Sequence, residues 1–264
     1  MILYRILKEF AFEISQVLCN IINASLFQGL VPSQWKCAVI VPLPKMIPTP
    51  SLDKLRPVSL TSTVAKVTET FISKWMIQNM SQSLDSQQFG NRKGRSTSHY
   101  LVQLVQHIHQ TWEDGLTANL LAVDYSKAFD RVDITVAIQK LIHMGVSSAL
   151  IPWISDFLTD RKQCVRVNGA TSEWYSVTCG VPQGTKVGPV VFMAMVNAVA
   201  DNIPHRWKYV DDITIAITHS PTSPSNNKME CLQTIMNGIF DAADQDNMSI
   251  NASKWHSSGD GNSC

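Results

Sequence analysis

The chain carries a strand–turn–strand pattern in one stretch, WKYVDDITIAIT at residues 207–218. Tyr209 and Val210 lead into two aspartates, and isoleucines then alternate with smaller residues, the period of a strand with one buried face. Adjacent carboxylates repel each other, and a divalent cation removes that repulsion because Mg²⁺ takes oxygen ligands. Asp211 and Asp212 therefore predict a metal site, with an exposed acidic turn as the alternative, because turns favour aspartate.

A third carboxylate, Asp124, closes the apolar run that begins at Asn119. A continuous apolar run of this length is typical of a strand buried on both faces. If this strand neighbours the 207–218 hairpin, Asp124 points past the sheet edge toward the paired aspartates. Asp130 and Asp133 follow closely and compete for the same role, and Asp124 alone also fits an ordinary strand-end acid.

Composition describes a globular chain, with 264 residues, 45% apolar and 16% charged. Its six cysteines are scattered without a C-x-x-C pair, which predicts reduced thiols in an intracellular protein of the cytoplasm or nucleus. The apolar run from Val190 to Ala200 contains Asn197 and is too short to cross a bilayer, so no membrane is expected as a partner.

Charge is divided unevenly along the chain although the net charge is only +1. Residues 31–100 hold nine basic against three acidic side chains, whereas residues 101–264 carry an acidic excess. A basic part beside an acidic part suits a protein that grips a polyanion and binds metal ions, and ordinary surface charge is the alternative. Three cations in the glycine-punctuated loop 88–96 are candidates for backbone-phosphate contacts: Arg92, Lys93 and Arg95.

Two further segments carry polar residues suited to a nucleotide. Lys45 and Arg56 flank a proline-rich loop, where cations suit a triphosphate. Gln183 and Gly184 lie in Gly-Val-Pro-Gln-Gly, where glycine allows close backbone approach to a ligand and the amide can bond a sugar, base or phosphate. Each of these residues also fits a solvated surface charge or a plain turn.

Periodicity predicts a mixed α+β fold. We expect helices at 1–30, 63–80, 101–112, 136–144, 150–158, from 189 onward and at 229–243. We expect strands at 38–43 and 119–124, a hairpin at 165–177 and a second one at 207–218. The segments 46–53 and 219–227 are predicted to be loops.

Five collinear segments together resemble the reverse transcriptase domain of non-LTR (LINE-type) retrotransposons, over roughly residues 30–255. They are Leu55-Arg56-Pro57-Val58-Ser59-Leu60, Gln88-Phe89-Gly90, Asp124-Tyr125-Ser126-Lys127-Ala128-Phe129-Asp130, Gly180-Val181-Pro182-Gln183-Gly184 and Tyr209-Val210-Asp211-Asp212. The resemblance implies a right-hand polymerase fold in which an antiparallel palm sheet packs on helices.

Site roles follow from the same resemblance, residue by residue. Asp124, Asp211 and Asp212 match the catalytic triad that holds two Mg²⁺ ions, with Mn²⁺ as an alternative. Phe129 matches the bulky residue that selects deoxynucleotides by excluding a 2′-hydroxyl. The implied nucleotide-binding set is Lys45, Arg56, Phe129, Gln183, Gly184 and Lys254, the last as a proton donor to pyrophosphate.

The implied organisation has an N-terminal helical segment at 1–30, fingers at 31–115 and a first palm part at 116–135. A fingers/palm insertion at 136–178, a second palm part at 179–255 and a disordered tail at 256–264 complete it. Two departures stand out: Lys186 replaces an apolar residue after the Gln-Gly pair, and the pattern after Lys254 dissolves, so a thumb is expected to be absent.

The expected function is RNA-directed DNA polymerisation, in which deoxynucleoside triphosphates extend a DNA primer on an RNA template by two-metal phosphoryl transfer. The missing thumb favours an alternative, a catalytically inactive RNA-binding protein built on the same fold. A Mg²⁺-dependent nuclease would explain the acids but gives no role to Gln183 or Phe129.

Overall fold

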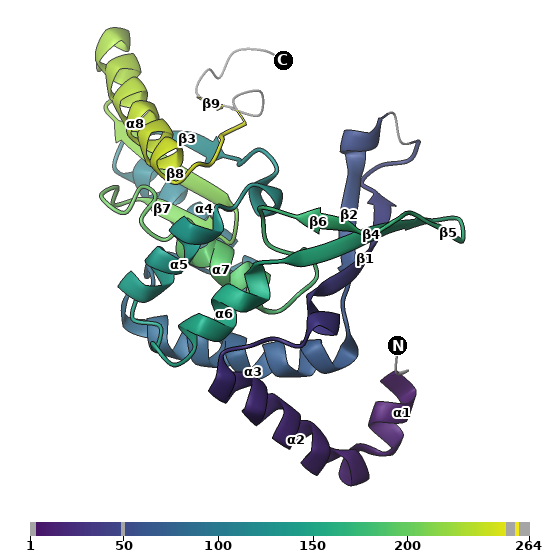
Figure 1. Ribbon diagram of the computed structural model, residues 1–264. Helices are drawn as coiled ribbons and strands as arrows, with labels where there is room; N and C mark the ends of the chain where they lie inside the picture. Colours follow the sequence, from purple (N-terminus) through teal and green to yellow (C-terminus); the bar gives the residue numbers. More distant parts are fainter. Residues whose placement is uncertain (1–3, 49–50, 252–256, 259–264) are drawn as a thin grey trace. The chain divides into compact units, whose positions relative to one another are not determined.

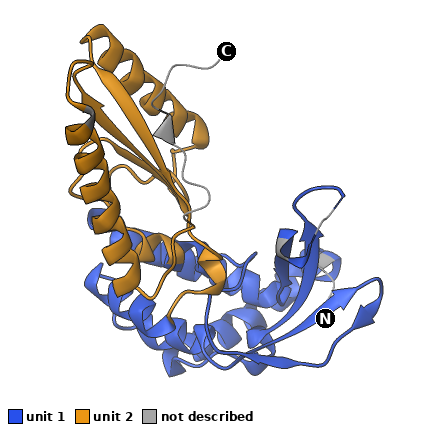
Figure 2. Ribbon diagram, turned by 90° about the horizontal axis from the view of Figure 1, so that it is seen from above, with its two compact units in different colours: residues 1–83, 134–191 blue, residues 84–133, 192–264 orange. Residues whose placement is uncertain are grey.

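The computed structural model describes residues 4–48, 51–251 and 257–258. They form two compact units, each assembled from separate parts of the chain (Figure 2). The first unit contains residues 1–83 and 134–191, and the second contains 84–133 and 192–264. Residues 84–115 group with the second unit and residues 179–191 with the first. The palm and fingers segments expected from the sequence stay a prediction.

The first unit combines helices with a five-stranded sheet (Figure 1). Its helices are α1 (Tyr4–Glu9), α2 (Ala11–Gln28), α3 (Thr63–Asn79), α5 (Ile134–His143), α6 (Ile151–Leu158) and α7 (Val187–Met195), which continues into the second unit. Its strands are β1 (Cys37–Pro44), β2 (Leu55–Leu60), β4 (Arg161–Val167), β5 (Ala170–Thr171) and β6 (Tyr175–Val177). Short 3₁₀ turns are η1 (Ser33–Lys36), η2 (Leu52–Lys54) and η3 (Met80–Gln82).

Strand β1 lies between an antiparallel partner, β2, and a parallel partner, β4. The β4 ladder ends at Ile40, so Pro42 and Pro44 lie where β1 pairs with β2 alone. Proline cannot donate to a ladder, which is why it is confined to strand positions with one free side. Within α6, the fully buried Trp153 stacks on Phe157 with ring centroids 5.3 Å apart.

The second unit is built on a four-stranded antiparallel sheet in the order β7-β8-β3-β9. Its elements are α4 (Thr97–Glu113), β3 (Thr117–Val123), η4 (Ala128–Asp130), β7 (Arg206–Tyr209), β8 (Asp212–His219), α8 (Ser225–Gln245) and β9 (Ser257–Ser258). Strand β3 pairs with β8 over its whole length, from Thr117 opposite His219 to Val123 opposite Ile213. Helices lie on both sides of this sheet (Figure 2).

Helix α4 covers one face of the second sheet through an apolar cluster. Phe89, Trp207 and Ala216 form its buried centre, and Tyr100 and Leu104 of α4 pack against them. The residues that alternate with these along the strands, including Val123, Ile213 and Ile215, are buried as well. The period-2 pattern of the sequence therefore sets which side chains meet α4.

Most expected elements are present within a residue or a few of their predicted bounds, and the α+β fold with an antiparallel sheet packed on helices is confirmed. Three expectations were wrong in detail. The first helix breaks at Phe10, α8 begins at Ser225 inside the expected loop, and β3 is not buried on both faces because Ala122 is exposed. Among the residues described, no helix is long and apolar enough to cross a bilayer.

Candidate functional site

The β3–β8 ladder brings two of the predicted acids to adjoining strand tips. The last paired residue of β3 is Val123, which lies opposite Ile213 on β8. Asp124 directly follows Val123, and Asp212 directly precedes Ile213. Both aspartates line a single cavity of about 430 Å³, here called the strand-end cavity. Its other lining residues are Thr97, Tyr100, Leu101, Ala122, Val123, Tyr209, Ile213 and Thr214.

Asp211 occupies the turn between β7 and β8, where Tyr209 pairs with Asp212. It is half-buried and does not line the strand-end cavity. The preceding residue, Val210, has φ 59°, in the left-handed region that a β-branched side chain rarely adopts. Such a conformation costs about 1–3 kcal/mol and persists only where the surroundings impose it.

The donor set of the cavity fits Mg²⁺, which takes hard oxygen ligands and is commonly held by one or two carboxylates plus substrate phosphates. Asp124 and Asp212 supply two carboxylates at one opening. Across the described part of the chain, no three His, Cys, Asp or Glu side chains are arranged to hold an ion by themselves. An ion held by this pair would take its remaining ligands from water and phosphate oxygens.

Asp124 is oriented by the chain segment near the C-terminal end of the described range. Its carboxylate oxygen Oδ2 accepts a hydrogen bond of 3.2 Å from the Asn251 side chain, and its backbone carbonyl accepts one of 2.8 Å from the Asn251 N–H. Asn251 lies three residues before Lys254 in the sequence. Lys254, the proton donor expected there, lies outside the described residues.

In the first unit, the segment at residues 55–60 contacts the loop at residues 180–184. The backbone N–H of Ser59 on β2 donates a 2.8 Å hydrogen bond to the carbonyl of Gln183. Gly184 has φ +95°, and a Cβ placed there would lie 3.3 Å from the Ser59 carbonyl, so the turn favours glycine. Arg56 lies on the same strand and is exposed, and Lys45 is exposed where its N–H bonds the Lys54 carbonyl.

A buried acid that the sequence analysis did not single out anchors this loop. Glu69 of α3 accepts hydrogen bonds from the N–H groups of Lys186 and Val187 at the start of α7, at 2.6 and 3.3 Å. Burial raises the pKa of Glu69, and the two N–H donors oppose that rise. The side chain of Lys186 is exposed, so this departure from the family pattern puts no cation into the core.

Phe129 belongs to the second unit and is half-buried. Its ring stacks on that of Phe192 with centroids 4.9 Å apart. Tyr125 meets the Phe192 ring edge-on, with centroids 6.1 Å apart. This packing fixes the ring rather than leaving it free in solvent.

The basic loop, residues 88–96, is bonded to the residues that directly precede it. Arg92 donates to the carbonyl of Asp85 at 3.0 Å, and Arg95 donates to the carbonyl of Ser86 and lies over the Phe89 ring at 5.1 Å. Lys93 is exposed. Some N–H donors of the two arginines are therefore bonded within the protein, and their contact with phosphates stays a prediction.

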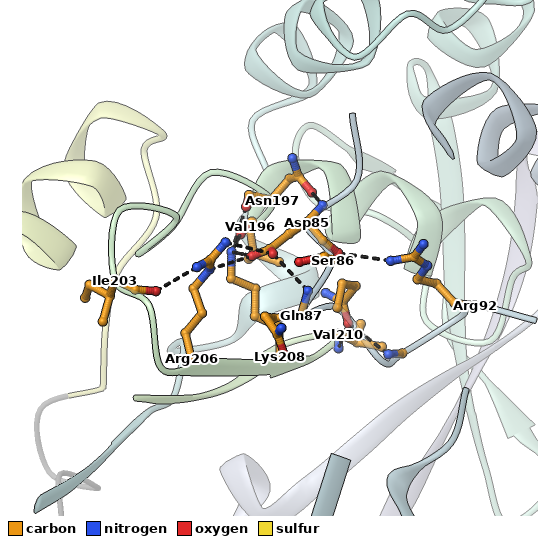
Figure 3. Close-up of polar contacts among 12 residues, drawn as sticks. Asp85, Ser86, Gln87, Arg92, Val196, Asn197, Ile203, Arg206, Lys208 and Val210 are labelled. Carbon is orange, nitrogen blue, oxygen red and sulfur yellow. Dashed lines mark hydrogen bonds and ion pairs between the residues drawn. The ribbon is translucent and has the colours of Figure 1, made fainter. Parts of the chain in front are cut away.

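Sequence reasoning missed the strongest electrostatic feature of the second unit, shown in Figure 3. The Asp85 carboxylate accepts hydrogen bonds from Arg206 at 2.8 and 2.9 Å, and forms an ion pair of 2.7 Å with the ammonium of Lys208. Burial opposes ionisation of Asp85, but the bonds from Arg206 and Lys208 outweigh it and lower its pKa. Lys208 is fully buried and also donates to the carbonyl of Asn197 at 2.7 Å.

An antiparallel sheet with carboxylates from adjoining strand tips at one cavity is suited to the binding of divalent ions and to phosphoryl transfer. The chain belongs to the reverse transcriptase (RNA-dependent DNA polymerase) family, whose family model matches residues 47–259.

Relatives among curated proteins include RNA-directed DNA polymerases of transposons and mobile elements. A probable RNA-directed DNA polymerase from transposon BS of Drosophila melanogaster is 33% identical over 181 residues, covering 66% of this chain and 20% of that protein. The RNA-directed DNA polymerase from mobile element jockey of the same organism is 27% identical and covers 90% of this chain and 27% of its own length. The chain thus spans about a quarter or less of these two relatives.

Solved structures confirm the polymerase type of fold. Apo telomerase from Candida tropicalis matches with TM-score 0.61 at 10% identity, covering 93% of this chain and 49% of that one. Telomerase from Candida albicans, in complex with a fragment of telomeric RNA, matches with TM-score 0.60 at 12% identity, covering 93% and 46%. At such low identity these likenesses carry the fold alone.

Proposed function

We propose that this chain is the catalytic domain of a retrotransposon reverse transcriptase, which extends a DNA primer on an RNA template with deoxynucleoside triphosphates. The observation that carries the proposal is the register of β3 and β8. That register places Asp124 and Asp212 at neighbouring strand tips, lining one cavity. Family membership supplies the reaction class.

Asp124, Asp212 and, from the turn, Asp211 would hold two Mg²⁺ ions, or Mn²⁺ in their place. When bound, the ions lower the pKa of the primer hydroxyl and stabilise the charge on the departing pyrophosphate. Asn251 orients Asp124 through its side-chain hydrogen bond. Leu101, Val123 and Ile213 contribute apolar lining to the strand-end cavity.

The remaining predicted residues would contact the nucleotide and the nucleic acid. Arg56 and Lys45 are exposed cations suited to the triphosphate, and Gln183 lies in the loop that Ser59 anchors. Gly184 gives that loop its left-handed turn. Lys254 would protonate pyrophosphate, and the basic loop of Arg92, Lys93 and Arg95 would contact template phosphates, with Lys93 the most accessible of the three.

Phe129 would exclude a 2′-hydroxyl from the nucleotide site. Its stack on Phe192 holds the ring in one place, as a steric filter requires. A smaller side chain should therefore admit ribonucleotides. Because RNA templates and deoxynucleotides are intracellular, we place the activity inside the cell, in the cytoplasm or nucleus.

Primer extension on an RNA template with Mg²⁺ and deoxynucleotides tests the proposal. Asp124→Asn should reduce the rate by at least about a thousandfold, because the carboxylate that binds the ion is lost while the side-chain shape is kept. Asp114→Asn is the matched control, since Asp114 is an exposed acid in the same unit that does not line the cavity.

Three outcomes separate the candidate functions. Extension that disappears in Asp124→Asn and persists in Asp114→Asn supports the polymerase. RNA binding without extension by the unmutated chain supports the inactive RNA-binding alternative, and cleavage of the template without extension supports a nuclease. In the polymerase case, Phe129→Ala should raise ribonucleotide incorporation relative to deoxynucleotide incorporation.

A further inference from the structure

Residues 87–89 lie alongside β7, the strand that leads into the paired aspartates. The N–H of Lys208 donates to the carbonyl of Gln87 at 2.9 Å, and the N–H of Phe89 donates to the carbonyl of Lys208 at 2.8 Å. The Asp85 network described above fastens the same segment two residues earlier (Figure 3). Both backbone and side-chain contacts therefore hold this segment against the catalytic hairpin.

Gln88 reaches from this segment to the turn itself. Gln88 is 1% exposed, and its Oε1 accepts hydrogen bonds from the N–H of Val210 at 3.1 Å and of Gly90 at 2.9 Å. Two backbone donors converging on one atom fix which end of the amide faces the turn. The other end, Nε2, is buried and has no partner among the described residues, so the acceptor oxygen is what this position uses.

Gly90 completes the contact by leaving room for the turn. A Cβ at this position would lie 2.5 Å from Cγ2 and 2.7 Å from the backbone N of Val210. The φ of Gly90 is not in the left-handed region, so the backbone alone does not demand glycine here. The requirement for glycine comes from the close approach of Val210.

Val210 is the residue that needs such support, because its left-handed φ of 59° is unfavourable for a β-branched side chain. Its conformation sets the direction in which the chain enters Asp211 and Asp212. We propose that Gln88 and Gly90 are positioning residues that impose the conformation of Val210 and thereby aim the two aspartates at the metal ions. This inference rests on the proposed function, but no sequence motif or family assignment gives these two residues that role.

Gln88→Met keeps an unbranched side chain of similar size but removes the oxygen that accepts from the N–H groups of Val210 and Gly90. The hairpin then loses one constraint on Val210, and we expect kcat for primer extension to fall at least tenfold. The KM for primer–template should change less than twofold, because the substitution is buried and touches no substrate. A misplacement of about 1 Å is enough for a loss of this size.

Val210→Gly distinguishes a positioning role of Gln88 from a purely structural one. Glycine adopts positive φ without steric cost, so a turn with glycine at this position needs less support. In the Val210→Gly background, Gln88→Met should therefore lower kcat less than threefold. An equal loss in both backgrounds, or a kcat within twofold of the unmutated protein in Gln88→Met alone, would overturn the inference.

Gly90→Ala tests the same inference by crowding, and Gly238→Ala is its matched control. A Cβ at Gly238 in α8 meets nothing within 4 Å, and its φ is likewise not in the left-handed region. Gly90→Ala should lower kcat at least tenfold with circular dichroism unchanged, whereas Gly238→Ala should leave kcat within twofold. Equal kcat values for the two folded variants would count against the proposal.

Two measurements keep the inference testable if the unmutated chain does not extend primers, an outcome that would defeat the proposed function alone. Hydrogen exchange at the Val210 amide should accelerate at least tenfold in Gln88→Met, because that N–H loses its acceptor. Mn²⁺ affinity, measured by electron paramagnetic resonance, should weaken at least threefold in Gln88→Met and stay unchanged in Gly238→Ala. Unchanged exchange and unchanged Mn²⁺ affinity would refute the positioning role directly.

Discussion

Asp85→Asn should destabilise the second unit far more than the loss of a surface ion pair would. The side chain of Asp85 is 2% exposed, and those of its partners Arg206 and Lys208 are 14% and 0% exposed. The substitution keeps the shape of the side chain but removes its charge. The ammonium of Lys208 is then left buried without a counter-charge.

The expected loss follows from that geometry. Breaking a buried pair by removing one partner costs about 3–5 kcal/mol, whereas an exposed pair is worth about 0–1 kcal/mol. Arg206 is less buried than Lys208 and can turn toward water, so most of the loss should come from Lys208. Lys208→Met in the Asp85→Asn background should accordingly recover part of the stability, because it removes the stranded charge.

Native-state hydrogen exchange of peptides covering β7 and β8 measures this loss where it occurs. The opening free energy of these strands should fall by about 3–5 kcal/mol at pH 7 in Asp85→Asn. Asp156→Asn is the control: its ion pair with Lys36, at 3.0 Å, belongs to the first unit, so β7 and β8 should exchange as in the unmutated protein. A change below about 1 kcal/mol in Asp85→Asn would refute the reasoning, since an exposed pair would suffice to explain it.

The pH dependence provides a second check on the same pair. The pKa of Asp85 is lowered in the folded state, so its contribution is fully present above its ordinary value of 3.8 and is lost as the pH falls through the lowered folded value. The difference between the unmutated protein and Asp85→Asn should therefore be constant from pH 7 to about 5 and shrink in more acidic solution. A difference that grows on acidification would contradict the assignment.

Three further outcomes are expected. Glu69→Ala leaves two N–H groups at the start of α7 unpaired and should cost about 1–3 kcal/mol in urea unfolding. Because the pKa of Glu69 is raised, the unmutated protein should also gain stability relative to Glu69→Gln as the pH falls from neutral toward 4.5. A loss of stability over that range would contradict the raised pKa. Tyr100→Phe removes the 2.6 Å hydroxyl bond to Thr214 and should lower the melting temperature by an amount equivalent to about 1 kcal/mol, with no loss at all counting against that bond. Ser25→Ala removes the acceptor of the buried Trp153 indole N–H at 2.9 Å and should cost about 1–3 kcal/mol by thermal unfolding, whereas a neutral result would show that another acceptor replaces it.

Local patterns in the sequence were sufficient to predict the elements around the site. Alternation along 207–218 fixes which residues share a face, because a shift of one residue would turn the buried isoleucines to the other side. The expected meeting of Asp124 with the paired aspartates follows from two strands ending in acids, and the ladder places Asp124 beside Asp212. Asp211 falls in the turn, and the direction of its side chain depends on a backbone angle that residue types do not specify.

The buried charges could not be predicted in the same way. Asp85 and Arg206 are separated by 121 residues, and each on its own has the sequence character of a surface residue. Lys208 lies in a strand flanked by aromatic residues, where alternation would leave it exposed, yet it is fully buried because its counter-charge comes from a distant segment. Glu69 meets its partners 117 residues later, so no local signal marks it.

The pairing of residues 87–89 with β7 has a consequence for association between molecules. A strand at the border of a sheet offers unpaired N–H and C=O groups, which can recruit a strand from another chain and begin aggregation. On β7 those groups of Lys208 are already occupied by Gln87 and Phe89. The chain thus covers this edge at Lys208 with its own backbone, and destabilising the segment would expose these groups to strands of other molecules.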